Sequence, residues 1–390
     1  MERVILTLNA GSSSIKLGLF EIGPEGPVRL AGGVIDLHQT PARMTLTVVG
    51  QERREMQLET SEDVEAVLGQ AIAAVERQVG ADRLRAVAHR VVHGGDRFAG
   101  PVVIDDRVLT EMEALAVLAP LHQPQALHLV RTIRRLRPDL LQTASFDTAF
   151  HRTMPERVRR FALPRALHDE GIRRYGFHGI SYSSIAATLA REHPELAQGR
   201  VIAAHLGSGA SLCAMRDGIS QDTSMGFSTL EGVPMATRCG RLDPGVILHL
   251  LGPGGRSLAE VEDLLYHRSG LLGVSGVSAD SRVLLASAEP EAAEALDLFA
   301  FRVAGEVARL TVALGGIDAL VFSAGIGENQ PAVRSRIADY LAWLGITLDP
   351  AANAANFRKI STPRARVACL VIPTDEELTL AKEAASHFHV

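Results

Sequence analysis

Residues 4–20 read Val4-Ile5-Leu6-Thr7-Leu8-Asn9-Ala10-Gly11-Ser12-Ser13-Ser14-Ile15-Lys16-Leu17-Gly18-Leu19-Phe20. An apolar run leads into a turn of small polar residues, and apolar positions then alternate with polar or small ones. This pattern predicts two strands joined by a tight turn. Further strands are expected over 28–37 and 44–49, before a helix that starts at Thr60-Ser61-Glu62-Asp63 and has one apolar face.

The same device returns half a chain later. Residues 201–211 read Val201-Ile202-Ala203-Ala204-His205-Leu206-Gly207-Ser208-Gly209-Ala210-Ser211, and a further turn falls at Asp217-Gly218. Leu8 corresponds to His205, an offset of 205 − 8 = 197 residues. A repeat of this size indicates two similar α/β domains, each offering a backbone-rich turn to a phosphate chain. Chance similarity of two unrelated β-hairpins is the alternative that this feature leaves open.

Two more glycine-rich elements follow the second turn. Residues 319–329 form an apolar run and then Gly325-Ile326-Gly327, and Pro331 suits the first turn of a helix. Strand, Gly-x-Gly and helix together are typical of nucleotide-binding proteins, although Gly-x-Gly alone is a weak signal. Residues 269–278 are predicted to be another loop of small residues.

Length and composition limit the class of protein. The chain has 390 residues, 46% of them hydrophobic and 22% charged, which favours a folded protein with two domains. A net charge of −5 with scattered Arg argues against nucleic-acid binding. No apolar run reaches the length of a membrane span or signal peptide, so a cytoplasmic location is predicted. Cys213, Cys239 and Cys369 lack CxxC spacing and are interpreted as buried small hydrophobes.

Several turns place cations beside glycines. They are His89-Arg90-Val91-Val92-His93-Gly94-Gly95, Arg173 to Gly179, and Thr237-Arg238-Cys239-Gly240, after which Asp243-Pro244 starts a helix. The apolar stretch 143–146 is predicted to be a buried strand that delivers Asp147 at its tip, where a metal or substrate is commonly bound. Two alternatives remain open. The His and Arg side chains could make only surface contacts, and Asp147 could merely cap the next turn.

Such residues suit phosphoryl transfer, which needs cations around the moving group and oxygen ligands for Mg²⁺. The sequence has no Gly-x-x-x-x-Gly-Lys-Ser/Thr motif, which excludes a Walker-type P-loop, and no His-Arg-Asp or Asp-Phe-Gly set of a protein kinase. A nucleotide must therefore be held by other elements.

Nearly end to end, the sequence resembles the acetate kinase family, in the acetate/propionate kinase group of the actin, sugar kinase and Hsp70 superfamily. The segments that carry the resemblance are 9–16, 89–95, 119–122, 146–151, 175–179, 222–227, 269–278, 325–329 and 372–377. The resemblance implies an α/β fold of two ribonuclease-H-like domains with a central cleft. It places the acyl- and Mg²⁺-binding domain at 1–148 plus a returning helix at 375–390, and the nucleotide-binding domain at 149–374. A homodimer is the usual assembly of the family.

Site residues follow from the resemblance position by position. Asn9 and Glu376 would hold Mg²⁺, for which Mn²⁺ is a substitute, with Asp147 close by. Arg90 would hold the acceptor carboxylate, and His178 and Arg238 would stabilise the transferring phosphoryl group. The residues expected at the acyl pocket are Val92, Leu121 and Phe177. Those expected at ATP or ADP are Ser12, Ser14, Lys16, His205, Leu206, Gly207, Ser208, Gly209, Asp280, Ser281, Arg282, Gly325, Ile326, Gly327, Glu328 and Asn329.

Three positions depart from the family pattern. Ser208 stands where an Asn is usual, so an amide contact to phosphate would be remade by hydroxyl, backbone or water. Gln123, in Leu121-His122-Gln123-Pro124-Gln125, replaces the usual Asn, and Thr229 replaces a pocket-lining Pro found in many members. Preference for an acyl chain length is therefore less determined than the reaction type.

The expected reaction is direct in-line transfer of the γ-phosphoryl group of ATP to acetate, giving acetyl phosphate and ADP, with the reverse reaction also available. Propionate or butyrate kinase is the alternative with the same chemistry, because one methylene changes binding by only about 1–3 kcal/mol. A nucleotide switch without catalysis is the alternative of another class. It would need an appended partner-binding domain, and this chain ends within a few turns of Glu376.

Overall fold

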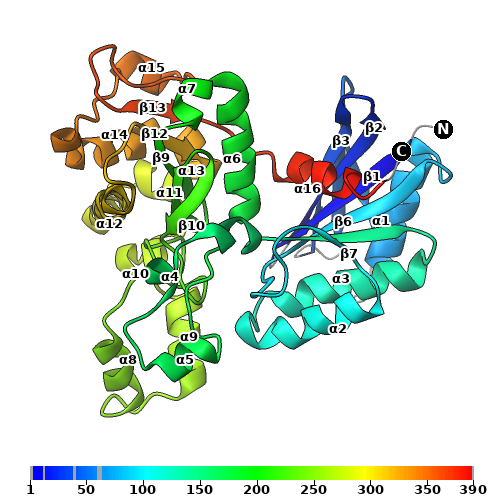
Figure 1. Cartoon of the computed structure of the whole chain (residues 1–390), viewed down its shortest axis with the longest axis horizontal. Coiled ribbons are helices and arrows are strands. Elements are labelled where there is room, and N and C mark those ends of the chain that lie inside the picture. The colour runs from blue at the N-terminus through cyan, green and yellow to red at the C-terminus, as the bar shows by residue number, and fades with distance from the viewer. Residues whose placement is uncertain (1–2, 12–13, 38–40, 59–63, 389–390) are drawn as a thin grey trace. The chain divides into compact units, whose positions relative to one another are not determined.

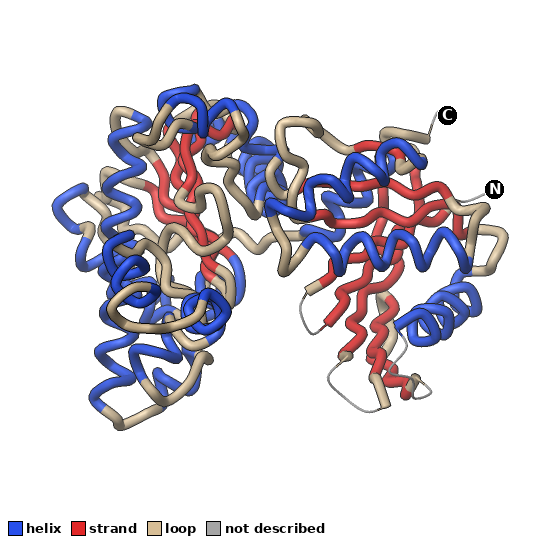
Figure 2. The backbone as a smooth tube through the Cα atoms, turned by 90° about the horizontal axis from the view of Figure 1, so that it is seen from below, coloured by secondary structure: helices blue, strands red, loops and turns tan. Residues whose placement is uncertain are grey.

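A computed structural model of the chain describes residues 3–11, 14–37, 41–58 and 64–388 (Figure 1). The chain divides into two compact units. Unit 1 comprises Met1–Phe150 together with Asp375–Val390, and unit 2 comprises His151–Thr374. Each unit has its own β-sheet with helices beside it (Figure 2). The predicted α/β class with two sheets is therefore confirmed.

Unit 1 contains an eight-stranded sheet in the order β5-β4-β3-β2-β1-β6-β8-β7. Strands β1 to β5 pair with one another in antiparallel fashion, β1, β6 and β8 run parallel to one another, and β7 is antiparallel to β8. The elements are β1 (Val4–Ala10), β2 (Ser14–Gly23), β3 (Gly26–Asp36), β4 (Arg43–Val48), β5 (Arg53–Gln57), α1 (Val64–Val79), β6 (Leu84–Val91), β7 (Val102–Val103), α2 (Asp106–Ala114), η1 (Leu115–Leu118), α3 (Gln123–Leu136), β8 (Leu141–Phe146) and α16 (Glu376–Ala385).

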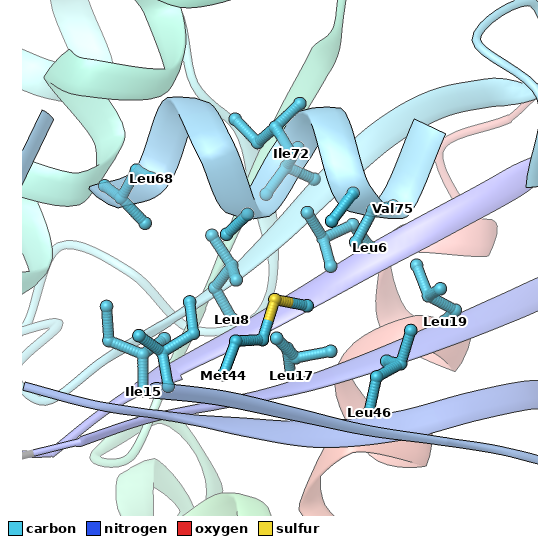
Figure 3. Close-up of a cluster of buried hydrophobic side chains, with 14 of the residues drawn as sticks. Leu6, Leu8, Ile15, Leu17, Leu19, Met44, Leu46, Leu68, Ile72 and Val75 are labelled. Carbon is cyan, nitrogen blue, oxygen red and sulfur yellow. The ribbon is translucent and has the colours of Figure 1, made fainter. Parts of the chain in front are cut away.

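Alternation along β1 gives the sheet two apolar faces. Leu6 and Leu8 point to one face, where they join Leu68, Ile72 and Val75 of α1 in a buried cluster (Figure 3). Side chains of α3 belong to the same cluster, so α1 and α3 cover one face together. Because successive strand residues face opposite sides, this pattern fixes the register of the sheet.

Helix α16 packs against β1, β2, β3, β6 and β8, and its buried residues lie outside the cluster under α1. Gly18 permits this close approach: a Cβ atom there would lie 3.1 Å from the Cβ atom of Glu377. The last helix of the chain thus returns to the first unit, as the family resemblance implied.

Unit 2 contains a five-stranded sheet in the order β11-β10-β9-β12-β13. The long helix α12 contacts β9, β10 and β11 through a stripe that includes Phe299, Val303 and Val307. The elements are α4 (Glu156–Arg159), α5 (Arg165–Asp169), α6 (Gly179–Glu192), α7 (Pro194–Ala197), β9 (Arg200–Leu206), β10 (Ala210–Arg216), β11 (Ile219–Thr223), α8 (Pro244–Leu251), α9 (Leu258–His267), α10 (Gly270–Ser275), α11 (Ser281–Ala286), α12 (Pro290–Leu314), β12 (Ala319–Ser323), α13 (Ala324–Asn329), α14 (Pro331–Tyr340), η3 (Ala342–Leu344), α15 (Pro350–Ala354) and β13 (Ala368–Val371), and η2 (Ala149–Thr153) spans the boundary between the units.

The repeat predicted from the sequence is confirmed in the strand order. In both sheets three antiparallel strands are followed by two parallel ones: β3-β2-β1-β6-β8 in unit 1 and β11-β10-β9-β12-β13 in unit 2. Leu8 pairs with Leu17, and His205 pairs with Ser211. The offset is therefore 197 residues for the first strand but 211 − 17 = 194 for the second, because the turn in unit 2 is three residues shorter.

Two predicted loops are helical. Residues 269–278 contain α10, and Gly325 to Asn329 lie in α13 rather than in an open loop. Small residues favour irregular structure, but tertiary packing of Leu271 and Ile326 stabilises short helices there. Pro331 begins α14 as expected. The start of the first helix, at Thr60 to Asp63, lies outside the described residues.

Two of the three cysteines have the predicted environment. Cys213 and Cys369 are buried as expected, whereas Cys239 is only half-buried. Within the described part of the chain, no helix is both long enough and apolar enough to cross a bilayer.

Candidate functional site

Arg90 and Asp147 meet at one edge of the sheet in unit 1. Strands β6 and β8 are parallel neighbours, so their carboxyl ends place Arg90 beside the residue that follows Phe146. Arg90 Nη2 lies 2.6 Å from Asp147 Oδ2, and Arg90 Nε lies 3.1 Å from both carboxylate oxygens. This is the two-pronged geometry that an arginine uses for a carboxylate. The predicted position of Asp147 at the tip of a buried strand is confirmed.

Asn9 and Glu376 extend this network. Asn9 Nδ2 donates to Glu376 Oε2 at 2.6 Å, and Asn9 Oδ1 accepts from Arg90 Nη1 at 3.0 Å. Asn9 lies near the end of β1, and Glu376 is the first residue of α16, so the returning helix brings together residues 367 apart in sequence. Four of the predicted site residues therefore form one connected cluster, which we call the Arg90 cluster: Asn9, Arg90, Asp147 and Glu376.

The Arg90 cluster contains two carboxyl groups, Asp147 and Glu376, and one guanidinium group. Burial by itself lowers the pKa of Arg90, but the charges of Asp147, Glu376 and Glu377 outweigh it and hold the pKa above its ordinary value. Burial raises the pKa of the Glu377 carboxyl, and the neighbouring charge of Glu376 raises it further. Carboxylates that repel each other in this way favour a bound cation.

Oxygen ligands at this cluster fit a hard divalent cation. In the described residues, no group of three or more His, Cys, Asp and Glu side chains is arranged to hold a metal. Mg²⁺ commonly uses only one or two carboxylates and keeps water or phosphate oxygens as its other ligands. The Glu376 carboxylate and the Asn9 amide oxygen meet that requirement, and neither sulfur nor imidazole is part of the Arg90 cluster.

Other predicted residues of unit 1 surround the cluster less closely. Lys16 pairs with Asn9 across β1 and β2, is exposed, and lowers the pKa of Glu377 through its charge. The backbone carbonyl of Ser14 closes the turn by accepting from Gly11. Val92 is buried, while Leu121 is 37% exposed. Ser12 lies outside the described residues.

Unit 2 brings its predicted imidazoles together. The rings of His178 and His205 stack with centroids 4.4 Å apart. His178 Nδ1 lies 2.8 Å from Ser211 Oγ, which in turn lies 2.5 Å from the hydroxyl oxygen of Tyr182. His178 itself has a φ of 59°, an uncommon conformation for a residue other than glycine, and it immediately precedes α6. The backbone and the hydroxyl groups together fix the orientation of this imidazole.

Gly209 lies between His178 and Arg238. A Cβ atom added to Gly209 would lie 3.4 Å from His178 Nε2 and 3.7 Å from Arg238 Nη2. Arg238 Nη1 donates to the carbonyl oxygen of Thr229 at 3.1 Å, a bond that a proline at this position would also accept. Ser208 is exposed, and its carbonyl accepts from the Ala236 N–H. The turn therefore presents a backbone without a side chain to an imidazole and a guanidinium group.

The segments predicted to hold a nucleotide lie in helices α11 and α13. Asp280 caps α11 and forms an ion pair with Arg282, and Ser281 Oγ accepts from Gln330 Nε2 at 2.6 Å. Ala324 starts α13 with a φ of 62°. Gly325 and Asn329 are exposed, Ile326 and Gly327 are buried, and Glu328 accepts from the Ala324 N–H. Phe177, expected at the acyl pocket, is 1% exposed.

Some residues of these networks were not assigned a role from the sequence. Ser211 and Tyr182 orient His178, and Gln123 binds the backbone of His93. The only hint of a role for Ser211 in the sequence is its place in the repeated turn. The register of β9 and β10 then places it beside His205. Gln123 departs from the family pattern, and the sequence gives no structural reason for the glutamine.

Comparisons with known proteins show what this chain is similar to. An acetate kinase of Rhodopseudomonas palustris (strain TIE-1) is 47% identical over 98% of this chain and 98% of its own length. The crystal structure of a propionate kinase from Francisella tularensis subsp. tularensis SCHU S4 aligns with a TM-score of 0.91 at 35% identity, covering 98% of each chain. That of the Porphyromonas gingivalis acetate kinase aligns with a TM-score of 0.88 at 36% identity, covering 98% of this chain and 99% of the other.

The resemblance seen in the sequence is confirmed by a family model as well. Residues 4–382 match the model of the acetokinase family. With that match across nearly the whole length, the chain belongs to the acetokinase family.

Proposed function

We propose that the protein is an acetate kinase, which transfers the γ-phosphoryl group of ATP to acetate and also catalyses the reverse reaction. The observation that carries the proposal is the position of Gly209 between His178 and Arg238, in a chain whose relatives are named acetate kinase. A guanidinium and an imidazole beside a glycine suit a phosphoryl group, because both can donate hydrogen bonds to its oxygens, over which the charge is spread.

In unit 1 we assign the acceptor and the metal to the Arg90 cluster. Among the described residues, three of the five N–H groups of Arg90 are engaged by Asp147 and Asn9, which leaves donors for an acceptor carboxylate. Asn9 and Glu376 would hold Mg²⁺, or Mn²⁺ in its place. When bound, the ion would offset the negative charge of the phosphates. Asp147 acts here as the group that orients Arg90.

In unit 2 we assign the nucleotide to the turn His205 to Gly209, to Asp280-Ser281-Arg282 and to Gly325 to Asn329. Helix α11 begins at Ser281 within the second segment, and the third segment lies within α13; the exposed residues of these segments include Arg282, Gly325 and Asn329. Lys16 and the hydroxyl groups of Ser12 and Ser14 are proposed to face the phosphates from unit 1. His178 and Arg238 would counter the charge on the phosphoryl group during transfer.

The chemistry needs no general base. Acetate is already an anion at neutral pH, since a carboxylic acid of this kind has a pKa near that of a glutamate, about 4.3. An acetate oxygen attacks the γ-phosphorus in line as the bond to the β–γ bridging oxygen breaks, and ADP leaves. Arg90, Arg238 and His178 would reduce the repulsion between the anions.

Acetate is preferred over longer acids in this proposal because the curated relatives at 45–47% identity carry the name acetate kinase. The propionate kinase of Francisella tularensis keeps propionate as the second candidate. Val92, Leu121 and Phe177 stay proposed as acyl-pocket residues.

The experiment compares kcat/KM for acetate, propionate and butyrate with saturating MgATP. We expect acetate to give the largest value, by a factor of about 10 or more over butyrate. The reverse assay uses acetyl phosphate and ADP and follows ATP. A protein that makes no ATP from any short acyl phosphate would be a nucleotide switch, and the proposal would be wrong.

A homodimer and a cytoplasmic location stay predictions. Light scattering on the purified protein tests the first, and cell fractionation tests the second.

A further inference from the structure

The Gln123 side chain is buried at the start of α3 and uses both ends of its amide. It is 0% exposed. Its Oε1 accepts from the backbone N–H of His93 at 3.1 Å, and its Nε2 donates to the backbone C=O of His93 at 3.0 Å. The same nitrogen lies 3.3 Å from the carbonyl oxygen of Met112. One side chain therefore binds both backbone groups of one residue, as a neighbouring strand would.

This pairing falls where the sheet stops. Strand β6 ends at Val91, so His93 lies beyond its ladder. The next two N–H groups also find side-chain acceptors: Gly94 donates to Thr148 Oγ1 and Gly95 donates to His93 Nδ1, each at 2.9 Å. Three consecutive buried amides are thus held by side chains. A loop fixed in this way has little freedom to move.

The two segments joined by Gln123 are those that carry the proposed acyl-pocket residues of unit 1. Val92 directly precedes His93, and Leu121 lies two residues before Gln123. The hydrogen bonds of Gln123 therefore connect these two segments directly. Glutamine is one methylene longer than the asparagine usual in the family pattern, so this chain spans the gap with a longer side chain.

We propose that Gln123 is a positioning and specificity-determining residue, whose amide fixes the spacing of the Val92 and Leu121 segments and so the size of the acyl pocket. The inference rests on the proposed function. Shortening the side chain to asparagine must either leave the His93 backbone groups unpaired or draw the two segments together. Either change alters the contacts of a short acyl chain without touching the nucleotide segments of unit 2.

The test compares Gln123→Asn with Gln125→Asn in the full-length protein. Gln125 is exposed on the same helix, so the control makes the same chemical change away from the hydrogen bonds to His93. For Gln123→Asn we expect the KM for acetate to rise roughly tenfold, as befits the loss of buried hydrogen bonds. The KM for ATP should change less than about twofold, and the ratio of kcat/KM for propionate to that for acetate should shift. Gln125→Asn should match the parent.

Amide hydrogen exchange gives a readout independent of activity. The His93 N–H should exchange faster in Gln123→Asn, because its acceptor is withdrawn. Faster exchange together with an unchanged acetate KM and an unchanged acyl profile would make Gln123 merely structural and overturn the proposal.

A second variant keeps the proposal testable if Gln123→Asn does not fold. Should Gln123→Asn not fold, Gln123→Glu retains the length and the acceptor for the His93 N–H but loses the donor to the His93 carbonyl, and an unchanged acetate KM there also overturns the proposal. Failure of the proposed function looks different, since the parent protein itself would then not phosphorylate acetate.

Discussion

The turn between β1 and β2 and the turn between β9 and β10 occupy equivalent places in sheets of the same strand order, yet the groups beside them differ in charge. Near the first, oxygen acceptors of Asn9, Asp147 and Glu376 surround one arginine. Beside the second, two imidazoles and Arg238 gather around Gly209. The difference teaches that strand order decides where functional groups meet, while the residues at those positions decide which ligand the place can hold.

The register makes the contrast concrete. Leu8 contributes to the apolar cluster under α1, whereas its counterpart His205 stacks on His178. Leu17 packs in the same cluster, and its counterpart Ser211 bonds to the His178 imidazole. One copy of the repeat used these positions for its core, and the other used them for polar groups.

The largest effect is expected from Arg238→Ala, which removes the guanidinium beside Gly209. We expect kcat to fall by about 10²–10³ or more, because a donor aimed at developing charge in a dry site is lost. The KM for ATP should change only a few-fold. Steady-state kinetics in both directions measure this, with the exposed Arg256→Ala as control. Near-normal turnover in Arg238→Ala would contradict the proposed role of Arg238 in phosphoryl transfer.

The next largest effect is expected from Glu376→Gln, which tests the proposed metal site in the Arg90 cluster. Loss of the carboxylate beside Asn9 should weaken the apparent affinity for Mg²⁺ about 10- to 100-fold. The variant keeps the size of the side chain, so the free energy of unfolding should change little. Titrating activity with Mg²⁺ measures the effect, and Glu383→Gln, on the same helix, serves as the matched control. Equal Mg²⁺ dependence of the two variants would exclude Glu376 as a ligand.

A smaller loss is expected from Gly209→Ala. The added methyl group meets His178 and Arg238 at ordinary contact distances, so the free energy of unfolding should change by less than about 0.5 kcal/mol. It nevertheless fills the space proposed for the phosphoryl group, and kcat/KM should fall roughly tenfold. Gly305→Ala in α12, where a Cβ atom meets nothing within 4 Å, is the control. Full activity of Gly209→Ala would contradict the proposed position of the phosphoryl group.

The smallest effect concerns stability rather than turnover, and it compares the two units directly. Burial lowers the pKa of His89 in unit 1 and of His151 in unit 2 to about 4. Between pH 4 and about 6.5 the unfolded chain binds protons that the folded one does not, so stability falls as the pH drops through this range and is level above it. Each histidine contributes at most about 1.4 kcal/mol per pH unit.

Urea unfolding at pH 7, 6 and 5 measures this dependence. His89→Gln and His151→Gln should each flatten it, whereas the exposed His249→Gln should leave it unchanged. Burial also lowers the pKa of His93 to about 4, so part of the pH dependence should remain after both substitutions. A pH dependence that neither substitution reduces would assign the acid sensitivity to other groups.

Local patterns were enough to predict the strands around both turns. The strands expected over 28–37 and 44–49 correspond to Gly26–Asp36 and Arg43–Val48. Periodicity succeeded here because each strand buries at least one face, which the alternation records. It failed for 269–278 and for Gly325 to Asn329, where short helices form from sequences rich in glycine and serine. Their stability comes from packing, which a local pattern does not contain.

By itself, the sequence determined the α/β class, the repeat of one strand order and the residue types needed for phosphoryl transfer, since these depend on alternation, spacing and chemical character. Only the tertiary structure decided which of those residues meet. Glu376 reaches Asn9 because the last helix returns to the first sheet, and Gln123 reaches His93 because α3 begins beside the end of β6. Contacts between residues far apart in sequence arise from the packing of whole elements, and no single segment encodes them.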